Sequence, residues 1–260
     1  MIGAVVIAGG NLGVRDALLD YTGVPKKALI PVAGKAMVNY VVEALAGCQR
    51  IRRIVVVGLE PEDGVQFGVP VDYVADQGKM LENALAGVDH LIAVEPQVDR
   101  IVLSAADIPL VTAEIVGWFI ETCLGMQADI FYSIVERSVM ERRFPGSGRS
   151  FRTLSDGSFA GGDLFLVSRK AMTTNLEFVR KVTDSRKGVW GLVRLLGFMT
   201  LLRFSVRRLS LAQVEQRASK ILGYPGRAVI APYAELAMDV DKPYQLDLVR
   251  ASFWRAGEAA

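Results

Sequence analysis

The sequence has very few of the residues that build metal cages and thiol sites. Its 260 residues include one histidine, His90, and two cysteines, Cys48 and Cys123, which lie far apart. A single histidine excludes a multi-histidine metal cage and an HExxH metalloprotease, and it argues against a serine–histidine triad. The cysteine spacing matches no CxxC or zinc motif, so we expect two reduced, packed thiols. We interpret His90, at the end of an expected helix, as structural.

Long uncharged apolar runs are also missing. The longest apolar stretch, residues 189–204, contains Arg194 and Arg203, whereas a membrane-spanning helix needs about 20 apolar residues with few charges. The first residues include no basic segment of the kind with which a signal peptide begins. Apolar residues nevertheless make up 51% of the chain, which excludes intrinsic disorder. We therefore predict a globular, cytoplasmic protein.

The overall charge is small but unevenly distributed. Thirty Lys and Arg against 28 Asp and Glu give a net charge of +2, which argues against a general nucleic-acid binder. Residues 137–209 contain 15 basic and 5 acidic residues, so this stretch carries +10 and the remainder −8. A basic stretch suits an anionic ligand or surface, although a solvated basic face is an equal alternative. Its Gly-rich part contains four arginines, namely Arg142, Arg143, Arg149 and Arg152.

The first half of the chain alternates apolar runs with amphipathic segments. Uninterrupted apolar runs of this kind are typical of parallel strands that are buried on both faces. Thr112 is a suitable N-cap for the last helix of this half. The expected strands cover residues 2–8, 54–58, 71–75 and 101–105, and the expected helices cover residues 38–45, 81–92 and 113–124. This order predicts a doubly wound, mostly parallel sheet flanked by helices.

The second half is less regular. Residues 142–162 are rich in Gly, Ser and Arg and are expected to form loops with short strands. We find no repeat or linker, so we predict a single α/β domain over residues 1–260, with parts at 1–125, 126–225 and 226–260. The further expected strands are 130–136, 163–168 and 228–231, and the further helices are 169–176, 189–204, 211–221 and 244–255.

A glycine pair and two lysines form the first candidate site. Gly9 and Gly10 follow the first strand, where glycine lets the backbone approach a base or a phosphate. Lys26 and Lys27 lie further along the same loop, and a lysine there can place a charge on a polyphosphate. The loop fits neither a Walker A motif nor a Rossmann fingerprint. A simple tight turn at the glycines is the structural alternative.

Carboxylates form the other candidates. Asp107 follows a central strand, where open α/β sheets bind ligands, and a carboxylate there suits Mg²⁺. Asp239 and Asp241 lie in a short extended segment near the end of the chain. We expect them to point to opposite faces, so that only one of the two faces a metal. The alternatives are that Asp107 and Asp241 merely cap the helices that follow them.

These segments together resemble a known family. The glycine pair after the first strand, Lys27-Ala-Leu-Ile-Pro-Val-Ala-Gly-Lys35, Ala106-Asp107-Ile-Pro109 and Asp239-Val-Asp-Lys-Pro243 occur in that order. The chain resembles the nucleotidyltransferase superfamily, in particular the NTP-transferase group that includes molybdenum-cofactor guanylyltransferase and sugar-1-phosphate uridylyltransferases. The resemblance covers roughly residues 1–125 and 225–255.

The resemblance implies a nucleotide-diphospho-sugar transferase fold and attack of an acceptor phosphate on the α-phosphorus of an NTP, with release of pyrophosphate. The implied partners are a nucleoside triphosphate and a phosphorylated small molecule, such as a sugar phosphate, a cofactor precursor or a lipid precursor, and no nucleic acid. Residues 1–125 would bind the NTP, and 126–225 would form the acceptor side. The implied site residues are Ala8, Gly9, Gly10, Gln77, Gly78 and Asn83 for the nucleotide, Lys27 for the phosphates, Asp107 and Asp241 for Mg²⁺, and Gly161, Gly162 and Asp163 for the acceptor.

Several points stay open at this stage. Arg15 comes one residue later than the arginine usual in the family, and Lys26 is an alternative to Lys27. Residues 188–208 either form a core helix, the favoured interpretation, or cover the acceptor pocket or a membrane surface. The competing functions are a GT-A glycosyltransferase that uses a sugar nucleotide and a non-catalytic nucleotide-binding regulator. The preferred base, the acceptor and the oligomeric state are not determined by the sequence.

Overall fold

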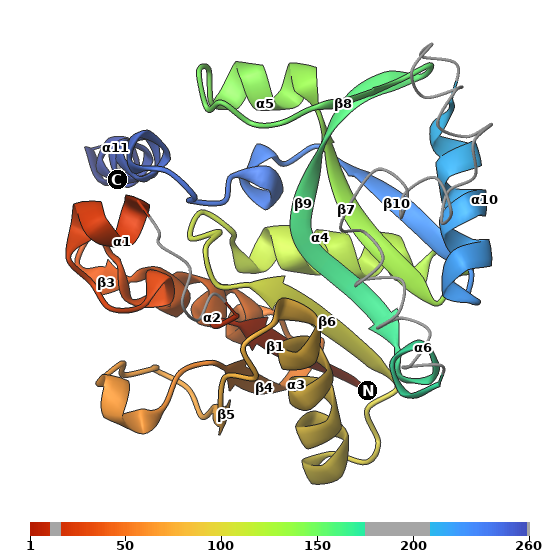
Figure 1. The fold of residues 1–260 in the computed structure, drawn as a ribbon, viewed down its shortest axis with the longest axis horizontal. Coiled ribbons are helices and arrows are strands. Elements are labelled where there is room, and N and C mark those ends of the chain that lie inside the picture. Colours follow the sequence, from red (N-terminus) through yellow and green to blue (C-terminus); the bar gives the residue numbers. More distant parts are fainter. Residues whose placement is uncertain (11–16, 175–208, 259–260) are drawn as a thin grey trace.

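The computed structural model describes residues 1–10, 17–174 and 209–258. An eight-stranded sheet runs through the molecule (Figure 1). From edge to edge it consists of β10 (Gly226–Ala231), β7 (Ile130–Glu136), β9 (Gly157–Ser168), β6 (Arg100–Ala105), β1 (Ile2–Ile7), β4 (Ile51–Val57) and β5 (Asp72–Val74), while β8 (Arg152–Leu154) pairs with β9. All neighbouring pairs that exclude β9 are parallel, so the predicted mostly parallel sheet is confirmed.

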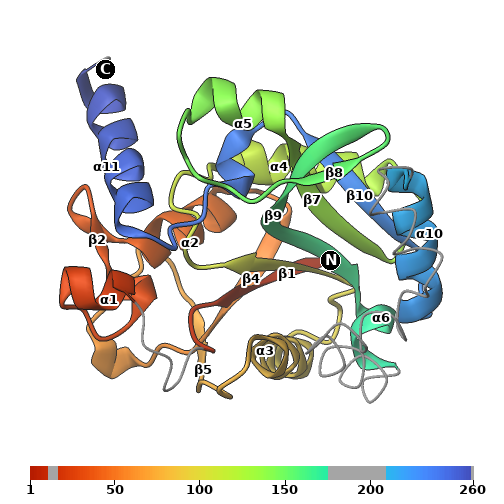
Figure 2. The same cartoon turned by 45° about the horizontal axis from the view of Figure 1, so that its top comes forward.

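Helices cover both faces of this sheet. Figure 2 shows α3 (Met80–Val94) below the sheet and α4 (Ala113–Leu124) above it. The remaining α-helices are α1 (Ala17–Thr22), α2 (Met37–Gly47), α5 (Arg137–Arg143), α6 (Arg169–Thr173), α10 (Leu211–Leu222) and α11 (Pro243–Glu258). Three short 3₁₀ turns, η1 (Lys27–Leu29), η2 (Pro61–Asp63) and η3 (Ala234–Ala237), and a hairpin of β2 (Pro31–Val32) and β3 (Lys35–Ala36) complete the described elements.

The apolar runs form strands because both faces of the sheet are buried. In β1, Ala4 and Val6 join the core cluster that includes α2 and α4, whereas Val5 joins the cluster that includes α3. Successive side chains of a strand point to opposite faces, so every position of such a strand must be apolar. As predicted, the Thr112 side chain caps α4 by accepting a hydrogen bond from the Ile115 N–H at 3.3 Å.

The second half departs from expectation at β9. The strand expected at residues 163–168 begins at Gly157 and runs antiparallel between β6 and β7. The expectation of loops with short strands over 142–162 is confirmed at β8 but is wrong at β9, because a Gly- and Ser-rich segment can join a sheet when neighbouring strands supply its hydrogen bonds. Helices α1 and α5 were not predicted. The apolar segment 189–204 lies outside the described residues.

The carboxyl ends of the parallel strands meet at one edge of the sheet. There the Ala8 N–H donates to the Val57 carbonyl at 2.8 Å, and the Gly58 N–H donates to the Val74 carbonyl at 2.9 Å. On the other side of β1, the Ala106 N–H donates to the Ile7 carbonyl at 3.1 Å. Backbone hydrogen bonds therefore hold the segments that leave β1, β4 and β6 side by side. Within the described part of the chain, no helix is long and apolar enough to cross a membrane.

Candidate functional site

A lysine lies between two carboxylates at this edge of the sheet. The Lys27 Nζ donates hydrogen bonds to Asp107 Oδ2 and to Asp241 Oδ1, each at 2.5 Å. The side chains of Lys27 and Asp107 are 17% and 19% exposed, while that of Asp241 is 55% exposed. The structure therefore brings together three residues that the sequence had implicated from three separate motifs, two of them 214 positions apart.

Local anchors explain how these three residues meet. Lys27 opens η1, and the next apolar side chains, Ala28 and Ile30, are buried in the core. Asp107 follows β6 directly, and the Val240 N–H donates to the Asp107 carbonyl at 3.0 Å. This backbone contact carries the segment that contains Asp241 to the carboxyl end of β6. Thr112, not Asp107, caps α4.

The surrounding charges keep Lys27 and Asp241 ionised. Burial lowers the pKa of Lys27, but the negative charges of Asp107 and Asp241 outweigh it and raise this pKa above its ordinary value. Burial alone would raise the pKa of Asp241. The neighbouring Asp239 carboxyl and the Lys27 ammonium outweigh this effect and lower the pKa below the usual range. Lys27 is therefore a permanent cation at neutral pH, unsuited to act as a general base.

The two carboxylates also fit a divalent cation. Asp107 Oδ2 and Asp241 Oδ1 converge on the single Nζ of Lys27, which holds the place of a cation between them. Asp107 Oδ1 is buried and has no hydrogen-bond partner in the described part of the chain. Within the described ranges, no group of three or more His, Cys, Asp or Glu is arranged to hold a metal ion. Mg²⁺ commonly binds through one or two carboxylates together with substrate phosphates, and this donor set matches that mode.

The glycine turn after β1 is packed tightly by its neighbours. A Cβ on Gly9 would lie 2.5 Å from Asp76 Oδ2, and a Cβ on Gly58 would lie 2.4 Å from the Gly9 nitrogen. Gly10 has a φ of +110°, which is accessible to glycine but strained for other residues. Close packing within the protein therefore accounts for both glycines, in agreement with the structural alternative of a tight turn.

The residues expected to contact the base lie beside this turn. The Gln77 side chain is exposed, and its Nε2 donates to the Ala75 carbonyl at 2.8 Å. Asn83 is fully buried, and its Oδ1 accepts from the Gln77 N–H at 2.6 Å. Asp76 begins the stretch of residues 76–78 that lies where the family often has base-contacting residues, although it was not among the implied site residues. Its side chain accepts hydrogen bonds from Gly10, Gly78 and Asn83, and its position two residues after β5 was a further signal.

Lys26 and Lys27, the two candidate lysines of this loop, have different partners in the structure. Lys26 is directed away from the Asp107–Asp241 pair, and its Nζ donates to Asp63 Oδ2 at 2.6 Å. Lys27 is thus the lysine that faces the paired carboxylates. Arg15, the other candidate, lies outside the described residues.

The expected acceptor residues lie on β9, next to Asp107. Because β6 and β9 are antiparallel with Ser104 opposite Leu164, Asp163 is placed at the end of β6. Burial, followed by the charges of Asp239 and Asp107, raises the pKa of Asp163 to about 8. Its Oδ2 is buried and finds no hydrogen-bond partner within residues 1–10, 17–174 and 209–258. Packing against the neighbouring strand β7 explains the glycines, since a Cβ on Gly161 would overlap the Tyr132 hydroxyl.

Arg149 completes this side of the site. Its guanidinium forms an ion pair with Asp239, and both side chains are largely buried. Burial raises the pKa of Asp239 to about 6, although Arg149 opposes this shift. The carboxyl groups of Asp239 and Asp241 each shift the pKa of the other, so the two side chains lie close together. The expectation that these two point to opposite faces was wrong, because positions two apart in an extended segment lie on the same side.

The basic stretch is only partly directed at the site. Arg149 reaches the carboxylates, whereas Arg143 pairs with Glu235 at 3.0 Å on the surface. Arg137 instead lies over the Phe151 ring. Eight of its fifteen basic residues lie within 175–208, outside the described residues.

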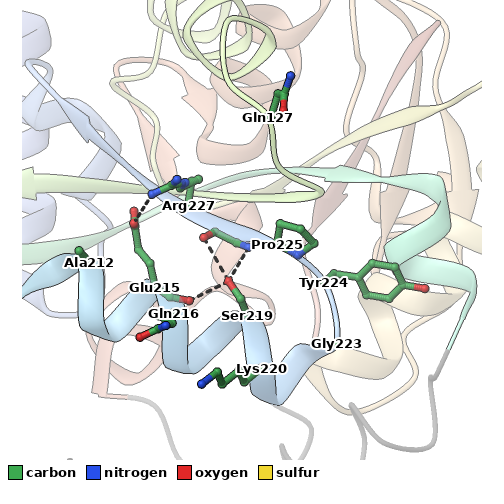
Figure 3. A pocket seen from close by; sticks show the side chains of 11 residues that line it. Gln127, Ala212, Glu215, Gln216, Ser219, Lys220, Gly223, Tyr224, Pro225 and Arg227 are labelled. Atoms are coloured by element: carbon green, nitrogen blue, oxygen red, sulfur yellow. Dashed lines mark hydrogen bonds and ion pairs between the residues drawn. The ribbon is translucent and has the colours of Figure 1, made fainter.

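A separate pocket of about 590 Å³ lies between α10 and the start of β10. Figure 3 shows Glu215 and Ser219 of α10 facing this strand. Glu215 Oε2 accepts from Arg227 at 2.9 Å, and the Ser219 hydroxyl accepts from the Gly226 N–H at 2.8 Å. The pocket lies at the β10 edge of the sheet and includes none of the predicted site residues.

Comparisons with known proteins agree with this geometry. The family model described as the MobA-like NTP transferase domain matches residues 4–177. A hypothetical transferase from Thermus thermophilus is 35% identical, with 95% of this chain and 100% of that chain covered and a TM-score of 0.82. A search of curated proteins finds no match.

Two more distant solved structures share the fold. CMP:2-keto-3-deoxy-manno-octonic acid synthetase, solved with CTP, is 14% identical over 98% of this chain and 99% of that chain, with a TM-score of 0.61. The 4-diphosphocytidyl-2C-methyl-D-erythritol synthase of Anaerococcus prevotii is 12% identical over 98% and 96%, with a TM-score of 0.56. The family match and the relative at 35% identity identify the enzyme class as nucleotidyltransferase. The chain therefore belongs to the family of MobA-like NTP transferase domains.

Proposed function

We propose that this nucleotidyltransferase joins the NMP part of an NTP to a phosphate-bearing small molecule and releases pyrophosphate. The observation that carries the proposal is the shared position of Lys27 Nζ between Asp107 and Asp241. It places one cation and two carboxylates at the carboxyl edge of the sheet, beside the glycine turn, where open α/β sheets bind ligands.

The nucleotide is assigned to the part of this edge formed by β1, β4 and β5. The backbone of Ala8, Gly9 and Gly10 lines the base and ribose, and Lys27 contacts the triphosphate. Gln77, Gly78 and Asn83 border the same region, with Asn83 acting from beneath through its hydrogen bond to the Gln77 N–H. Residues 1–125 accordingly form the nucleotide-binding half of a single domain.

Asp107 and Asp241 are the residues that would hold Mg²⁺. A bound Mg²⁺ would offset the negative charge that develops on the α-phosphate and the leaving pyrophosphate. Of the two late carboxylates, Asp241 is the better candidate because it converges with Asp107 on one point. Asp239 is already engaged by Arg149.

The acceptor is assigned to the side formed by Gly161, Gly162 and Asp163. An oxygen of its phosphate forms a bond to the α-phosphorus, and the bond from that phosphorus to pyrophosphate breaks. A phosphate monoester is ionised at neutral pH, so the nucleophile needs no base. Lys27, protonated throughout, orients the triphosphate and neutralises charge, which is the main requirement of such transfers.

Pyrophosphate release tests this proposal directly. Each of the four NTPs is incubated with Mg²⁺ and a panel of sugar phosphates, other phosphate monoesters and matched unphosphorylated alcohols. We expect release with at least one NTP, and only with phosphorylated acceptors. The Asp107→Asn variant should lose this release. Turnover with a finished sugar nucleotide and no NTP would instead support the glycosyltransferase, and NTP binding without any turnover would support the regulator.

A further inference from the structure

Asp76 is half-buried, and both of its carboxylate oxygens are occupied by donors from the protein. Its Oδ2 accepts from the Gly10 N–H at 3.0 Å. Its Oδ1 accepts from the Gly78 N–H at 2.8 Å and from Asn83 Nδ2 at 2.9 Å. One side chain thus connects the turn after β1, the loop after β5 and the first turns of α3.

Asn83 extends this connection from the other side. It is fully buried on α3, donates to Asp76 and accepts from the Gln77 N–H at 2.6 Å. Both the oxygen and the nitrogen of its amide are therefore hydrogen-bonded. Together, Asp76 and Asn83 hold the loop before α3 at two successive residues, Gln77 and Gly78. We call Asp76 and Asn83 the clasp.

The clasp and the glycines fit each other closely. A Cβ on Gly9 would meet the Asp76 carboxylate at 2.5 Å, and one on Gly10 would lie 3.1 Å from the Met80 nitrogen at the start of α3. The turn is therefore enclosed by Asp76, by α3 and, through Gly58, by the end of β4. Burial opposes ionisation of Asp76, but its three hydrogen bonds and the charge of Lys26 lower its pKa, so it accepts these bonds as a carboxylate.

We propose that Asp76 is a positioning residue for the nucleotide, which with Asn83 holds the Gly9–Gly10 turn in the conformation that receives the NTP. This inference rests on the proposed function, because it takes the turn to be the nucleotide-binding surface. Asp76 acts through the backbone and not on the base, since its lone pairs are engaged by Gly10, Gly78 and Asn83. A preformed turn avoids the cost of ordering it on binding.

The Asp76→Asn variant tests the clasp. An amide has one acceptor oxygen, so its NH₂ group must face either the Gly10 N–H or the donors of Gly78 and Asn83, and at least one of the three bonds to Asp76 is lost. If the competent conformation falls to a tenth of the population, the apparent affinity for NTP falls about ten-fold. We expect the KM for NTP to rise by about this factor, while kcat and the acceptor KM change less than about three-fold.

A charge-preserving exchange provides the rescue. In Asp76→Asn/Asn83→Asp, the amide at 76 can donate to the carboxylate at 83, which still accepts from the Gln77 N–H. We expect this double variant to recover part of the lost NTP affinity. Asp63→Asn is the matched control, because Asp63 is a carboxylate that pairs with the neighbouring Lys26 but contacts neither Gly9 nor Gly10. Its KM for NTP should remain that of the wild type.

Calorimetric titration with each NTP provides a second readout that needs no turnover. A rise in the dissociation constant of Asp76→Asn with partial recovery in the exchange variant supports the clasp. An unchanged dissociation constant, or an equal loss in the Asp63→Asn control, would overturn it. Loss of thermal stability in Asp76→Asn without a change in NTP affinity would also overturn it. Absence of pyrophosphate release from the wild type would refute the proposed function, and the NTP titration would still decide the role of Asp76.

Discussion

The two sides of the site differ in how fully their polar groups are paired. On the nucleotide side, the carboxylate oxygens of Asp76 and the amide oxygen and nitrogen of Asn83 are all hydrogen-bonded within the protein. On the acceptor side, Asp163 Oδ2 and Arg149 Nε are buried without hydrogen-bond partners among the residues that the structure describes. Buried polar groups are normally satisfied, and exceptions concentrate where function requires them. The comparison indicates a preformed nucleotide side and an acceptor side that is strained in the free protein.

The largest effect is expected where the two sides meet, at Lys27. Replacing it in Lys27→Met removes the cation that faces the triphosphate and leaves Asp107 and Asp241 without their shared partner. Loss of one such electrostatic group costs about 10²–10³ in kcat. Steady-state pyrophosphate release measures this loss. The neighbouring Lys26→Met, which removes only the pair with Asp63, should stay within a few-fold of the wild type; equal losses would contradict the separation of the two lysines.

The next largest effect concerns the Arg149–Asp239 pair on the acceptor side. In Arg149→Met the Asp239 carboxylate remains buried without its cation, and breaking a buried ion pair in this way costs roughly 3–5 kcal/mol of unfolding free energy. Urea denaturation measures this value.

The exposed pair Arg50–Glu121 is the matched comparison, because both side chains are more than half exposed and its loss should cost at most about 1 kcal/mol. The double variant Arg149→Met/Asp239→Leu should recover much of the stability. If Arg149→Met costs no more than Arg50→Met, the pair is not held in a buried environment.

A smaller effect, an increase in the unfolding free energy, is expected when Asp163 is replaced. Its pKa of about 8 in the folded protein lies above the value near 3.9 of an unfolded chain. Between these values the folded state binds more protons than the unfolded state, so the unfolding free energy falls as the pH rises from about 4 to about 8. Asp163→Asn removes this dependence.

The variant should therefore be more stable than the wild type by roughly 1–3 kcal/mol above pH 8, with a smaller difference near pH 4. Urea denaturation at both pH values measures the difference. The acceptor KM of the variant should rise, whereas its NTP affinity should not. A wild type that gains stability over this pH range relative to Asp163→Asn would contradict the strained acceptor side.

The sequence predicted the parts of the site that depend on local pattern. Apolar runs located β1, β4 and β6, and the glycine pair and Asp107 follow those strands because ligand groups gather at strand ends. The polar groups that connect distant segments were less accessible. The Val240 contact with Asp107 and the Arg149–Asp239 pair depend on how β9 and η3 bring the end of the chain back to β6, which no local periodicity encodes.

Gly161 and Gly162 also show that a local sequence pattern does not reveal contacts between distant segments. The resemblance marks them as acceptor residues, but their packing is explained by Tyr132 and Ser133 of the neighbouring strand β7, because a Cβ on Gly161 or Gly162 would overlap these side chains. A glycine chosen for packing and one chosen for ligand approach look identical in a sequence. Only the neighbouring strand reveals which atoms the missing Cβ would meet.

The most direct test of the central claim follows the fate of the α-phosphorus. The accepted NTP is supplied in two forms, labelled at the α- or at the γ-phosphorus, together with Mg²⁺ and the phosphorylated acceptor. The account predicts that the α-label enters the acceptor product, that the γ-label leaves as pyrophosphate, and that Lys27→Met slows both by about 10²–10³. Transfer of the γ-label to the acceptor, or full activity in Lys27→Met, would contradict it.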